Sequence, residues 1–542
     1  MGARRLTPCR PAHTGSSAPS IRTIRTGRCG QTPGVATEHQ ETERSYDGAL
    51  RTPLAADGLP GAASVRREPV VRLDAVYFDT PDLRLLRRGV TLRRRTGGHD
   101  AGWHLKTPAP DGSRTETRLP ADAGERDGPP EELLARAAIH ARGGRLDAVA
   151  HLRTRREPTL LLDEDGRTLA EIVRDTVSAE QLGGTGSTGD PATRPVDWTE
   201  TEVELGEAGP ELLDAVEERL LADGLRPSDS PTKLGRALKA RLDAIPGGAG
   251  SAPPPGPDTC DSVGDYLTAY LRSHIAALES LDAAVRLDEP DSVHRMRVHI
   301  RRLRSVLAAH RRFLRRDAVE DVDKELRRLG RILGRARDAE VMGEQLATAA
   351  SDLPGDLRPR ATRRLLETVF RDRYASAWRA AVEAMERPRY FALVDALEDL
   401  AADPPLRGRA RRGRKQARKV MEKQRKRVVK RLRPALAQPA GHDRDVALHR
   451  ARKAAKRARY AAESSEPLLK KRARRQAKHA KRIHKALGDH QDAAVGETTL
   501  HEVAAQAPPD IAFALGVLRS RQRAGEESQL SEAAKAGRKL GL

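Results

Sequence analysis

Aromatic side chains, cysteines and long apolar runs are all scarce in this sequence of 542 residues. Phe, Trp and Tyr together make up 3% of the chain, and there are three cysteines. No stretch approaches the roughly 18 apolar residues that a membrane-spanning helix requires. Cys9, Cys29 and Cys260 lack the spacing of zinc ligands or of a disulfide framework. The sequence therefore predicts a reducing, cytoplasmic location without a membrane partner.

The first 37 residues also lack the apolar core of a secretory signal. They contain Arg, Ser and Thr but no acidic residue before Glu38, which superficially resembles a transit peptide. We favour a disordered leader or a mis-started tail for residues 1–37, and the transit peptide stays open as the alternative.

Negative charge is too sparse to balance the positive charge. The formal net charge is +22, and residues 411–485 alone hold 29 Lys and Arg against 5 Asp and Glu. The remainder of the chain is close to neutral. An excess of this size implies an anionic partner, although it does not specify a fold.

A basic segment with helical spacing is repeated in the sequence, at residues 294–304 and again 155 positions later at 449–459. At about 100° per residue, four basic side chains of each copy fall on one narrow stripe. The stripes are His294, Arg297, Arg301 and Arg304 in the first copy, and His449, Arg452, Lys456 and Arg459 in the second. Stacked cations repel one another unless an anion lies along them. The stripes are therefore candidate anion-binding surfaces.

A second matched segment follows in each copy with an offset of 154. Its basic positions are Lys324, Arg327 and Arg331 in the first copy, and Lys478, Lys481 and Lys485 in the second. Two matched helices in the same order indicate two copies of one helical unit. We expect Gly334 and its counterpart Gly488 to end these helices. We expect residues 407–433 to form a further basic helix or arm.

The period of the side-chain pattern divides the chain into two expected domains. Residues 38–243 contain short β-rich segments and end with a helix expected over 210–222. Residues 244–258 are rich in Pro and Gly, which is typical of a linker. From residue 259 the pattern is helical, with copies at about 259–400 and 405–542. We predict an α+β domain followed by an all-α domain of duplicated antiparallel helical bundles.

Charged residues of both signs alternate along the expected strands, so that they share strand faces. These faces carry Arg93 with Arg95, Glu41 with Glu43, and Glu200 with Glu202 and Glu204. Such alternation is most often the wet face of a half-buried sheet. It is also the pattern of a barrel whose lumen holds cations for phosphates and carboxylates for a divalent metal. The alternation alone leaves both interpretations open.

The order of several motifs decides between them by resemblance. Glu41-Thr42-Glu43-Arg44-Ser45 resembles the Glu-x-Glu-x-Lys opening of the CYTH family, the triphosphate tunnel metalloenzymes. The later motifs of that family follow in order: Tyr77-Phe78-Asp79-Thr80, Arg93 and Arg95, Trp103-His104-Leu105-Lys106, Arg114-x-Glu116-x-Arg118, Glu200-x-Glu202-x-Glu204 and Ser230-Pro231-Thr232-Lys233-Leu234. The resemblance covers about residues 38–243. It implies an antiparallel eight-stranded β tunnel that binds a triphosphate and a divalent metal.

The same resemblance implies roles for individual residues. The phosphate-binding residues would be Arg93, Arg95, Lys106, Arg118, Arg156 and Lys233, with Arg155 as a one-residue alternative to Arg156. The ligands of Mg²⁺ or Mn²⁺ would be Glu41, Glu43, Asp175, Glu202 and Glu204, with Glu41 and Glu43 as the catalytic pair. Hydrolysis of a triphosphate or a related phosphoanhydride is the implied reaction.

One departure from the family pattern bears on catalysis. Ser45 stands where the family has Lys. Arg44 is a poor substitute, because adjacent residues of a strand face opposite ways. A missing interior cation weakens the stabilisation of transition-state charge. The sequence thus leaves open whether the tunnel is a catalyst or an inert binding site.

The twice-written segments resemble the CHAD family over about residues 259–542. His294-x-x-Arg-x-x-x-Arg-Arg-x-Arg and Leu333-Gly-Arg-Ala-Arg-Asp338 are similar to the family's first-half signatures. The resemblance implies an all-helical domain that binds inorganic polyphosphate through its basic face. It also implies a cytoplasmic location, at polyphosphate granules.

Three functions remain to be compared: a phosphohydrolase tethered to polyphosphate, a polyphosphate-binding protein with an inert tunnel, and a nucleic-acid binder. Proteins that bind single strands stack bases on aromatic side chains, and the basic stripes contain none between their cations. No helix-turn-helix signature is evident either. We therefore expect inorganic polyphosphate and a triphosphate-containing small molecule as partners, with nucleic acid bound at most nonspecifically.

Overall fold

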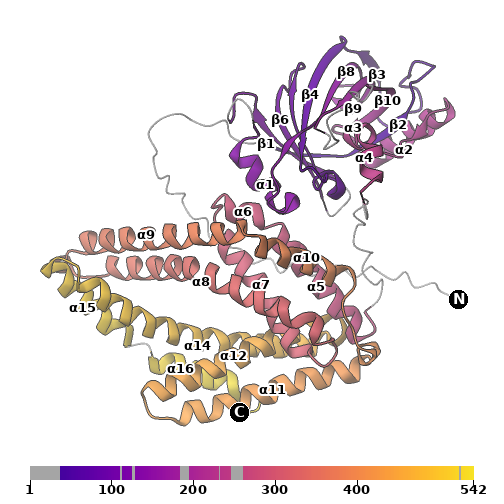
Figure 1. Cartoon of the computed structure of the whole chain (residues 1–542). Helices are drawn as coiled ribbons and strands as arrows, with labels where there is room; N and C mark the ends of the chain where they lie inside the picture. Colours follow the sequence, from indigo (N-terminus) through magenta and orange to yellow (C-terminus); the bar gives the residue numbers. More distant parts are fainter. Residues whose placement is uncertain are drawn as a thin grey trace. The chain divides into compact units, whose positions relative to one another are not determined.

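The computed structural model describes residues 37–109, 113–124, 128–183, 195–230, 232–245, 260–523 and 526–542. The chain divides into two compact units, with the boundary between residues 252 and 253. Figure 1 shows the strand-rich N-terminal unit and the helical C-terminal unit. The expected leader before residue 37, most of the expected linker, Cys9 and Cys29 lie outside the described residues.

The N-terminal unit is built on one antiparallel sheet. Its strands are β1 (Thr37–Glu41), β2 (Glu43–Asp47), β3 (Ser64–Arg67), β4 (Val71–Asp79), β5 (Thr91–Thr96), β6 (Gly102–Pro108), β7 (Arg114–Pro120), β8 (Asp147–Leu162), β9 (Thr168–Gln181), β10 (Val196–Leu205) and β11 (Arg226–Pro227). Its helices are α1 (Glu131–Ala141), α2 (Pro210–Ala222), α3 (Lys233–Ala237), α4 (Lys239–Asp243) and the short η1 (Leu86–Arg88). The helix expected over 210–222 is confirmed.

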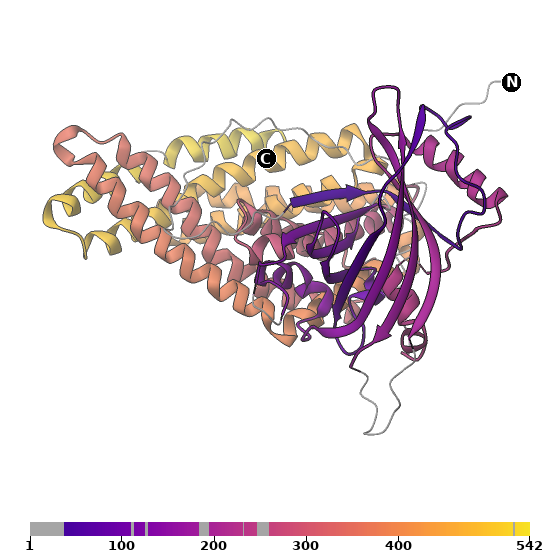
Figure 2. The same cartoon turned by 90° about the horizontal axis from the view of Figure 1, so that it is seen from above.

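The strands are ordered β1-β7-β6-β5-β4-β8-β9-β10-β2-β11, and β3 pairs with β8. Figure 2 shows how strongly this sheet curves. The antiparallel architecture is confirmed, but the hydrogen-bonded ladder does not close into a barrel within the described residues. The two ends of the sheet are instead joined covalently, because Thr42 alone separates β1 from β2. Counting β1 and β2 as one interrupted strand, and leaving out the short β3 and β11, gives the eight strands expected.

The apolar core of this unit lies mainly on the outer face of the sheet. On β2, Tyr46 is 1% exposed and packs in a cluster with Leu212 and Val216 of α2. A second cluster joins Leu92 and Trp103 to Leu133 of α1. Because neighbouring residues of a strand face opposite ways, this burial leaves the charged positions on the inner face.

The C-terminal unit is helical throughout its described length. The helices of its first half are α5 (Val263–Glu279), α6 (Asp282–Arg286), α7 (Ser292–His310), α8 (Asp317–Ser351), α9 (Pro359–Glu386) and α10 (Pro388–Ala402), with η2 (Gly355–Leu357) between α8 and α9. After η3 (Gly408–Arg411) come α11 (Arg414–Ala437), α12 (His442–Ser464), α13 (Glu466–Leu469), α14 (Lys471–Ala504), α15 (Pro509–Arg523) and α16 (Glu526–Arg538). None of the described helices combines the length and the apolar composition needed to cross a bilayer.

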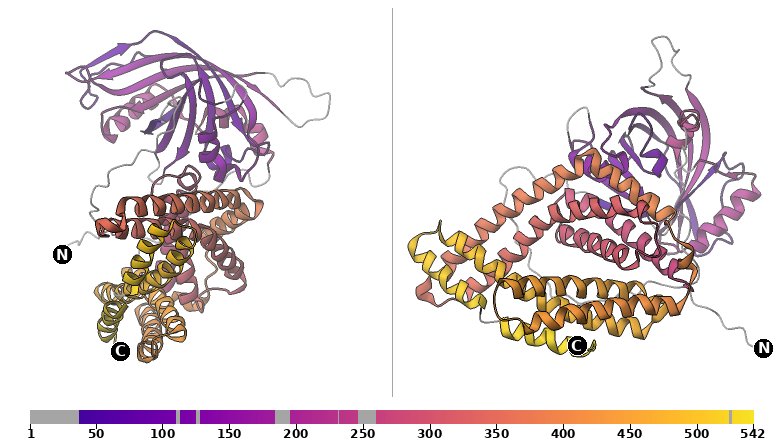
Figure 3. Two further views of the ribbon diagram at one scale, coloured as in Figure 1. Left: turned by 90° about the vertical axis from the view of Figure 1, so that its left-hand side faces the viewer. Right: turned by 60° about the horizontal axis from the view of Figure 1, so that its bottom comes forward.

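The two halves repeat the same packing. Helix α7 packs on α8 and α8 on α9, and in the same way α12 packs on α14 and α14 on α15. Figure 3 shows the first half in pink to orange and the second in orange to yellow. The two basic helices, α7 and α12, contact each other. They bring the twice-written stripe together from both halves.

One sequence-based expectation about this unit is wrong and another is made specific. Gly334 and Gly488 do not end helices, because they lie inside α8 and α14. Of the two possibilities for residues 407–433, the basic helix is confirmed as α11, which is a core helix of the second half. Its Val428 and Leu432 are fully buried in one cluster with Leu448 of α12. The high Lys and Arg content of this segment conceals an apolar stripe at helical spacing.

Candidate functional site

A polar cavity lies on the inner face of the N-terminal sheet. The side chains that line it are Glu43, Tyr77, Thr91, Arg93, Arg95, Asp100, Lys106, Arg114, Glu116, Arg118, Arg156, Glu202, Glu204, Thr232 and Lys233. Nine of these residues, from six strands and one helix, were expected from the sequence. Asp175 contacts two of them, as shown below. The side chain of Glu41 lies outside what the structure describes.

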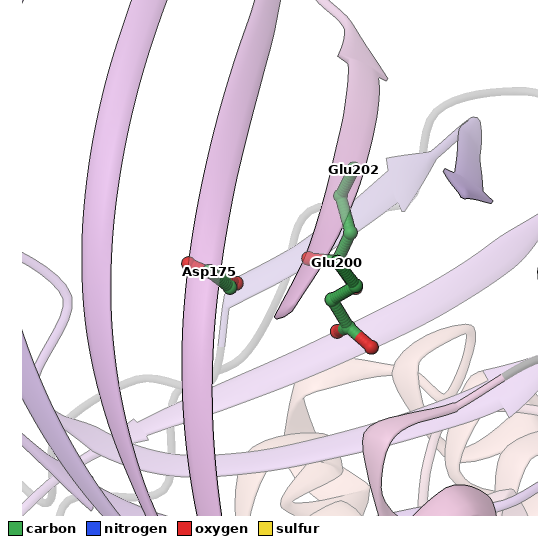
Figure 4. Close-up of side chains that lie close together, drawn as sticks. All are labelled: Asp175, Glu200 and Glu202. Carbon is green, nitrogen blue, oxygen red and sulfur yellow. The ribbon is translucent and has the colours of Figure 1, made fainter. Parts of the chain in front are cut away.

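Three carboxylates meet at the wall of the cavity that Glu202 lines. Asp175 on β9 lies directly opposite Glu200 on β10 in the strand register, and Glu202 follows on the same strand face. Oxygen atoms of all three lie within 4.8 Å of one another (Figure 4). Asp175 and Glu200 are buried, and Glu202 is partly exposed. Glu200 was quoted as part of a motif but was not expected as a ligand.

Two cations hold this acidic group together. The Nζ atom of Lys233 lies 3.1 Å from Asp175, 2.6 Å from Glu200 and 2.5 Å from Glu202. Arg156 donates to both carboxylate oxygens of Asp175, at 2.9 and 2.7 Å, and its Nη2 lies 3.2 Å from Glu202. Arg156 is also directly opposite Asp175 in the β8–β9 register, which leaves Arg155 facing outward.

The charges at this wall shift the protonation equilibria. Burial alone would raise the pKa of Glu202, but Lys233 and Arg156 outweigh it and lower that pKa to about 2. Burial likewise opposes the charge of Lys233, yet the surrounding carboxylates raise its pKa. Both Glu202 and Lys233 are therefore charged near neutral pH.

The donor set fits a hard divalent cation. Mg²⁺ and Mn²⁺ prefer carboxylate oxygens, and two further carboxylates extend the wall. Glu43 on β2 lies directly opposite Glu204 on β10, so their Cβ atoms are expected to be about 5 Å apart. Like charges at that separation are destabilising without a cation between or beside them.

The opposite wall is rich in cations. Lys106 and Arg114 reach Glu43 at 3.4 and 3.5 Å, so β2 contacts β6 and β7 across the cavity. Arg93 donates to the Tyr77 hydroxyl at 3.2 Å. Because Lys106, Arg114 and Arg93 project from three strands into one space, they can surround a multiply charged anion.

Glu116 organises part of the cationic wall. It accepts a hydrogen bond from the imidazole of His104 at 3.0 Å and pairs with Arg118. Burial would raise the pKa of Glu116, but His104, Lys106 and Arg93 lower it strongly. Burial, for its part, lowers the pKa of His104 to about 4. Sequence reasoning did not select Glu116 or Arg114, although the period-two spacing from 114 to 118 placed both beside Arg118.

Ser45 lies on the strand face of Glu43 and directly opposite Glu202. This is the position where the family pattern has Lys. Arg44 points the other way, since its guanidinium pairs with Asp214 and Glu217 of α2. The expectation that Arg44 cannot replace the interior Lys is confirmed.

The basic stripes of the helical unit converge where α7 contacts α12. The charges that act most strongly on Lys456 of α12 are those of Arg297, Arg301 and Arg304 on α7 and of Arg452 on its own helix. A histidine that sequence reasoning missed, His484 of α14, also faces this group. We call these six residues the central cation cluster.

The remaining expected cations lie around this cluster and are mostly exposed. Lys324 bonds to Asp321 at 2.9 Å, and Arg327 shares Asp323 with Arg304. Exposed positions without such anchoring are Arg331, Lys478, Lys481 and Lys485. The expected anion-binding surface thus has a dense centre, and most of its other cations are exposed.

The two expected histidines differ in their surroundings. Burial and the charge of Arg337 lower the pKa of His294. His449 instead bonds through Nδ1 to Gln491 at 2.8 Å, and Arg452 donates to the same Gln491 oxygen at 2.9 Å. Neither histidine is among the strongest influences on Lys456.

Comparisons with known proteins identify both units. A CYTH domain model matches residues 60–230, and a CHAD domain model matches residues 269–501. Two uncharacterised proteins from strains of Mycobacterium tuberculosis are each 36% identical to this chain over 498 residues, covering 89% of it and 93% of their own length. The chain belongs to the CYTH–CHAD family.

Solved structures resemble parts of this CYTH–CHAD protein. PptA from Streptomyces chartreusis is 21% identical and covers 51% of this chain and 99% of its own, with a TM-score of 0.43. The CHAD domain of the plant Ricinus communis is 25% identical over 53% of this chain and 97% of its own, with a TM-score of 0.41. An adenylyl-cyclase-like protein of Hippeastrum with a dominant triphosphatase activity is 16% identical over 37% of this chain and 96% of its own, with a TM-score of 0.22.

The two glycines of the CHAD unit that were expected to end helices each lie beside an arginine side chain. A Cβ atom on Gly334 would lie 3.5 Å from Nη2 of Arg297, and one on Gly488 would lie 3.3 Å from Nη2 of Arg452. The equivalent arginine in each half therefore packs beside the equivalent glycine. Glycine costs a helix interior roughly 1 kcal/mol relative to alanine, so a packing reason for these positions is expected.

Proposed function

We propose that the CYTH unit binds a triphosphate together with Mg²⁺ or Mn²⁺ and hydrolyses a phosphoanhydride bond, while the CHAD unit binds inorganic polyphosphate. The observation that carries the first part is one cavity with a carboxylate wall and a cation wall. The observation that carries the second is the central cation cluster, drawn from both halves of the CHAD unit. We place this function in the cytoplasm, at polyphosphate granules.

In the CYTH unit, the basic residues would bind phosphate and the acidic residues would bind the metal. Six cations would offset the phosphate charge. They are Arg93 and Arg95 on β5, Lys106 on β6, Arg118 on β7, Arg156 on β8 and Lys233 on α3. Glu41, Glu43, Asp175, Glu202 and Glu204 would hold the metal. A divalent cation bound there supplies charge neutralisation and an activated water for in-line attack. Carboxylates on the same wall would orient that water and accept its proton.

An inert tunnel is the alternative, and Ser45 is the observation that favours it. Without a cation at position 45, the substrate loses one contact that would strengthen in the transition state. In that case the CYTH unit would bind a triphosphate without turnover, and the protein would serve as a polyphosphate-binding protein.

Phosphate release by the full-length protein tests the catalytic part. We expect release from tripolyphosphate or ATP with Mg²⁺ or Mn²⁺ that stops on chelation. Glu41→Gln/Glu43→Gln should lower this rate by about tenfold or more, because two of the metal-binding carboxylates lose their charge. The matched control is Glu164→Gln/Asp165→Asn, which changes two exposed residues in the β8–β9 turn. Equal rates for the wild type and the Glu41/Glu43 variant would leave the inert tunnel as the correct description.

A binding competition tests the CHAD part. We expect the full-length protein to bind polyphosphate roughly tenfold or more tightly than single-stranded DNA with the same number of phosphates, because the central cation cluster offers charge without aromatic stacking. Both affinities should fall steeply with salt. Equal or tighter DNA binding at physiological salt contradicts this assignment and favours the nucleic-acid alternative.

A further inference from the structure

Lys456 is the one amine inside the central cation cluster, and it has no anionic partner there. Its side chain is partly buried on α12, and it makes no hydrogen bond or ion pair with any other described residue. The four charges that act most strongly on it are all positive. His484, facing it from α14, adds no negative charge.

The carboxylates near the cluster are already paired with arginines. Asp323 bonds to Arg304 at 2.9 Å, Asp338 bonds to Arg297 at 3.1 Å, and Glu463 bonds to Arg459 at 2.6 Å. On α14, Asp492 interacts with Arg452. These carboxylates therefore interact with arginines of the cluster or beside it, and none of them forms an ion pair with Lys456.

The other helices packed on α12 direct their charges elsewhere. The charges of Arg427 and Arg431 of α11 act on Arg457, and neither is among the four charges that act most strongly on Lys456. From α5, Tyr270 lies near Glu463 and Arg459. The environment of Lys456 is thus set by α7, α14 and its own helix.

Burial among positive charges affects the protonation of an amine differently from that of a guanidinium. Arginine keeps its proton under almost all conditions, whereas a buried lysine can release its proton. Burial first, and then Arg301, Arg452, Arg304 and Arg297, lower the pKa of Lys456 to about 7. The pKa of His484 is lowered to about 3, so His484 stays neutral in the same range.

We propose that Lys456 is largely neutral in the ligand-free protein above neutral pH and takes up a proton when a phosphate chain enters the central cation cluster. This inference rests on the proposed polyphosphate function of the CHAD unit and adds a regulatory property to it. The phosphate charge stabilises the ammonium form, so the bound state holds one more proton than the free state. Affinity should then fall as the pH rises above about 7, by up to about tenfold per pH unit.

Calorimetry of the full-length protein with polyphosphate of defined length measures this proton directly. At pH 8, the binding enthalpy should differ between two buffers of different ionisation enthalpy, in proportion to an uptake of close to one proton per bound segment. Affinity measured at pH 7, 8 and 9 should decline with the slope given above.

Two variants separate the lysine from the rest of the cluster. Lys456→Arg keeps a permanent charge, so it should bind with little pH dependence and without proton uptake, and more tightly than the wild type at pH 9. Lys456→Met should also be independent of pH but weaker than the wild type at pH 7. Proton uptake that persists in Lys456→Arg overturns the proposal. Absence of binding at every pH would instead overturn the polyphosphate function on which it rests.

Discussion

Replacing Arg156 with Met is expected to destabilise the CYTH unit by about 3–5 kcal/mol, the usual cost of removing one partner from a buried ion pair. The Asp175 side chain is fully buried, and Arg156 contributes two of its hydrogen bonds. Without Arg156, Lys233 alone would face Asp175, Glu200 and Glu202. Like-charge repulsion among the three carboxylates would add to the loss.

Urea unfolding followed by tryptophan fluorescence measures this effect. A Trp378→Phe background leaves Trp103 and Trp198, which both lie in the CYTH unit. Arg156→Met/Asp175→Asn is the matched double variant, and it should recover part of the lost stability because no unpaired buried charge remains. An Arg156→Met change below about 1 kcal/mol would show that the pair is not structurally important.

The same network predicts the pH dependence of stability. The pKa of Glu202 is lower in the folded state than its ordinary value, so its contribution is present above that ordinary value and is lost as the pH falls toward about 2. In Arg156→Met this carboxyl loses one of its two cationic neighbours. The difference in stability between wild type and variant should therefore shrink on acidification below about pH 4.5.

The domain order and the inner face of the CYTH unit could be predicted from the sequence because each rests on a local pattern. Period-two spacing placed Glu43, Arg93 and Glu202 on charged strand faces, the motif order implied that these faces point inward, and a helical period set the CHAD unit apart. What failed were inferences that depend on tertiary packing. Gly334 has the local signature of a helix stop, but it lies inside α8, where a Cβ atom would be 3.5 Å from Nη2 of Arg297.

In the candidate sites, too, local patterns predicted some residues, whereas tertiary packing determined others. The resemblance assigned roles to nine of the residues that line the CYTH cavity, yet it assigned none to Glu200 and Glu116, although both belong to the matched motifs. Their importance comes from cross-strand neighbours, which the sequence does not specify. In the CHAD unit the repeat located both basic stripes, but the convergence of α7 on α12 decides which cations meet. That convergence singles out Lys456 and His484, whereas Arg331 and Lys485 remain at the exposed periphery.

Replacing Ser45 with Lys is expected to increase the efficiency of triphosphate hydrolysis. The new ammonium would project from β2 toward Glu202, on the strand face that already carries Glu43. A hydrogen bond to a charged phosphate oxygen contributes about 1.5–3 kcal/mol, which corresponds to roughly tenfold to a hundredfold in kcat/KM. Steady-state phosphate release from tripolyphosphate with Mg²⁺ or Mn²⁺ measures the gain.

The division of this gain between kcat and KM shows how the interior cation acts. A fall in KM at constant kcat would mean that the ammonium binds ground state and transition state equally, whereas a rise in kcat would mean that it stabilises charge developing in the transition state. Ser45→Met is the matched control, since it adds a side chain of similar length without charge, and it should not increase the rate. If Ser45→Lys and Ser45→Met behave alike, position 45 does not contact the substrate, and the catalytic difference from the family pattern must lie in other residues of the cavity.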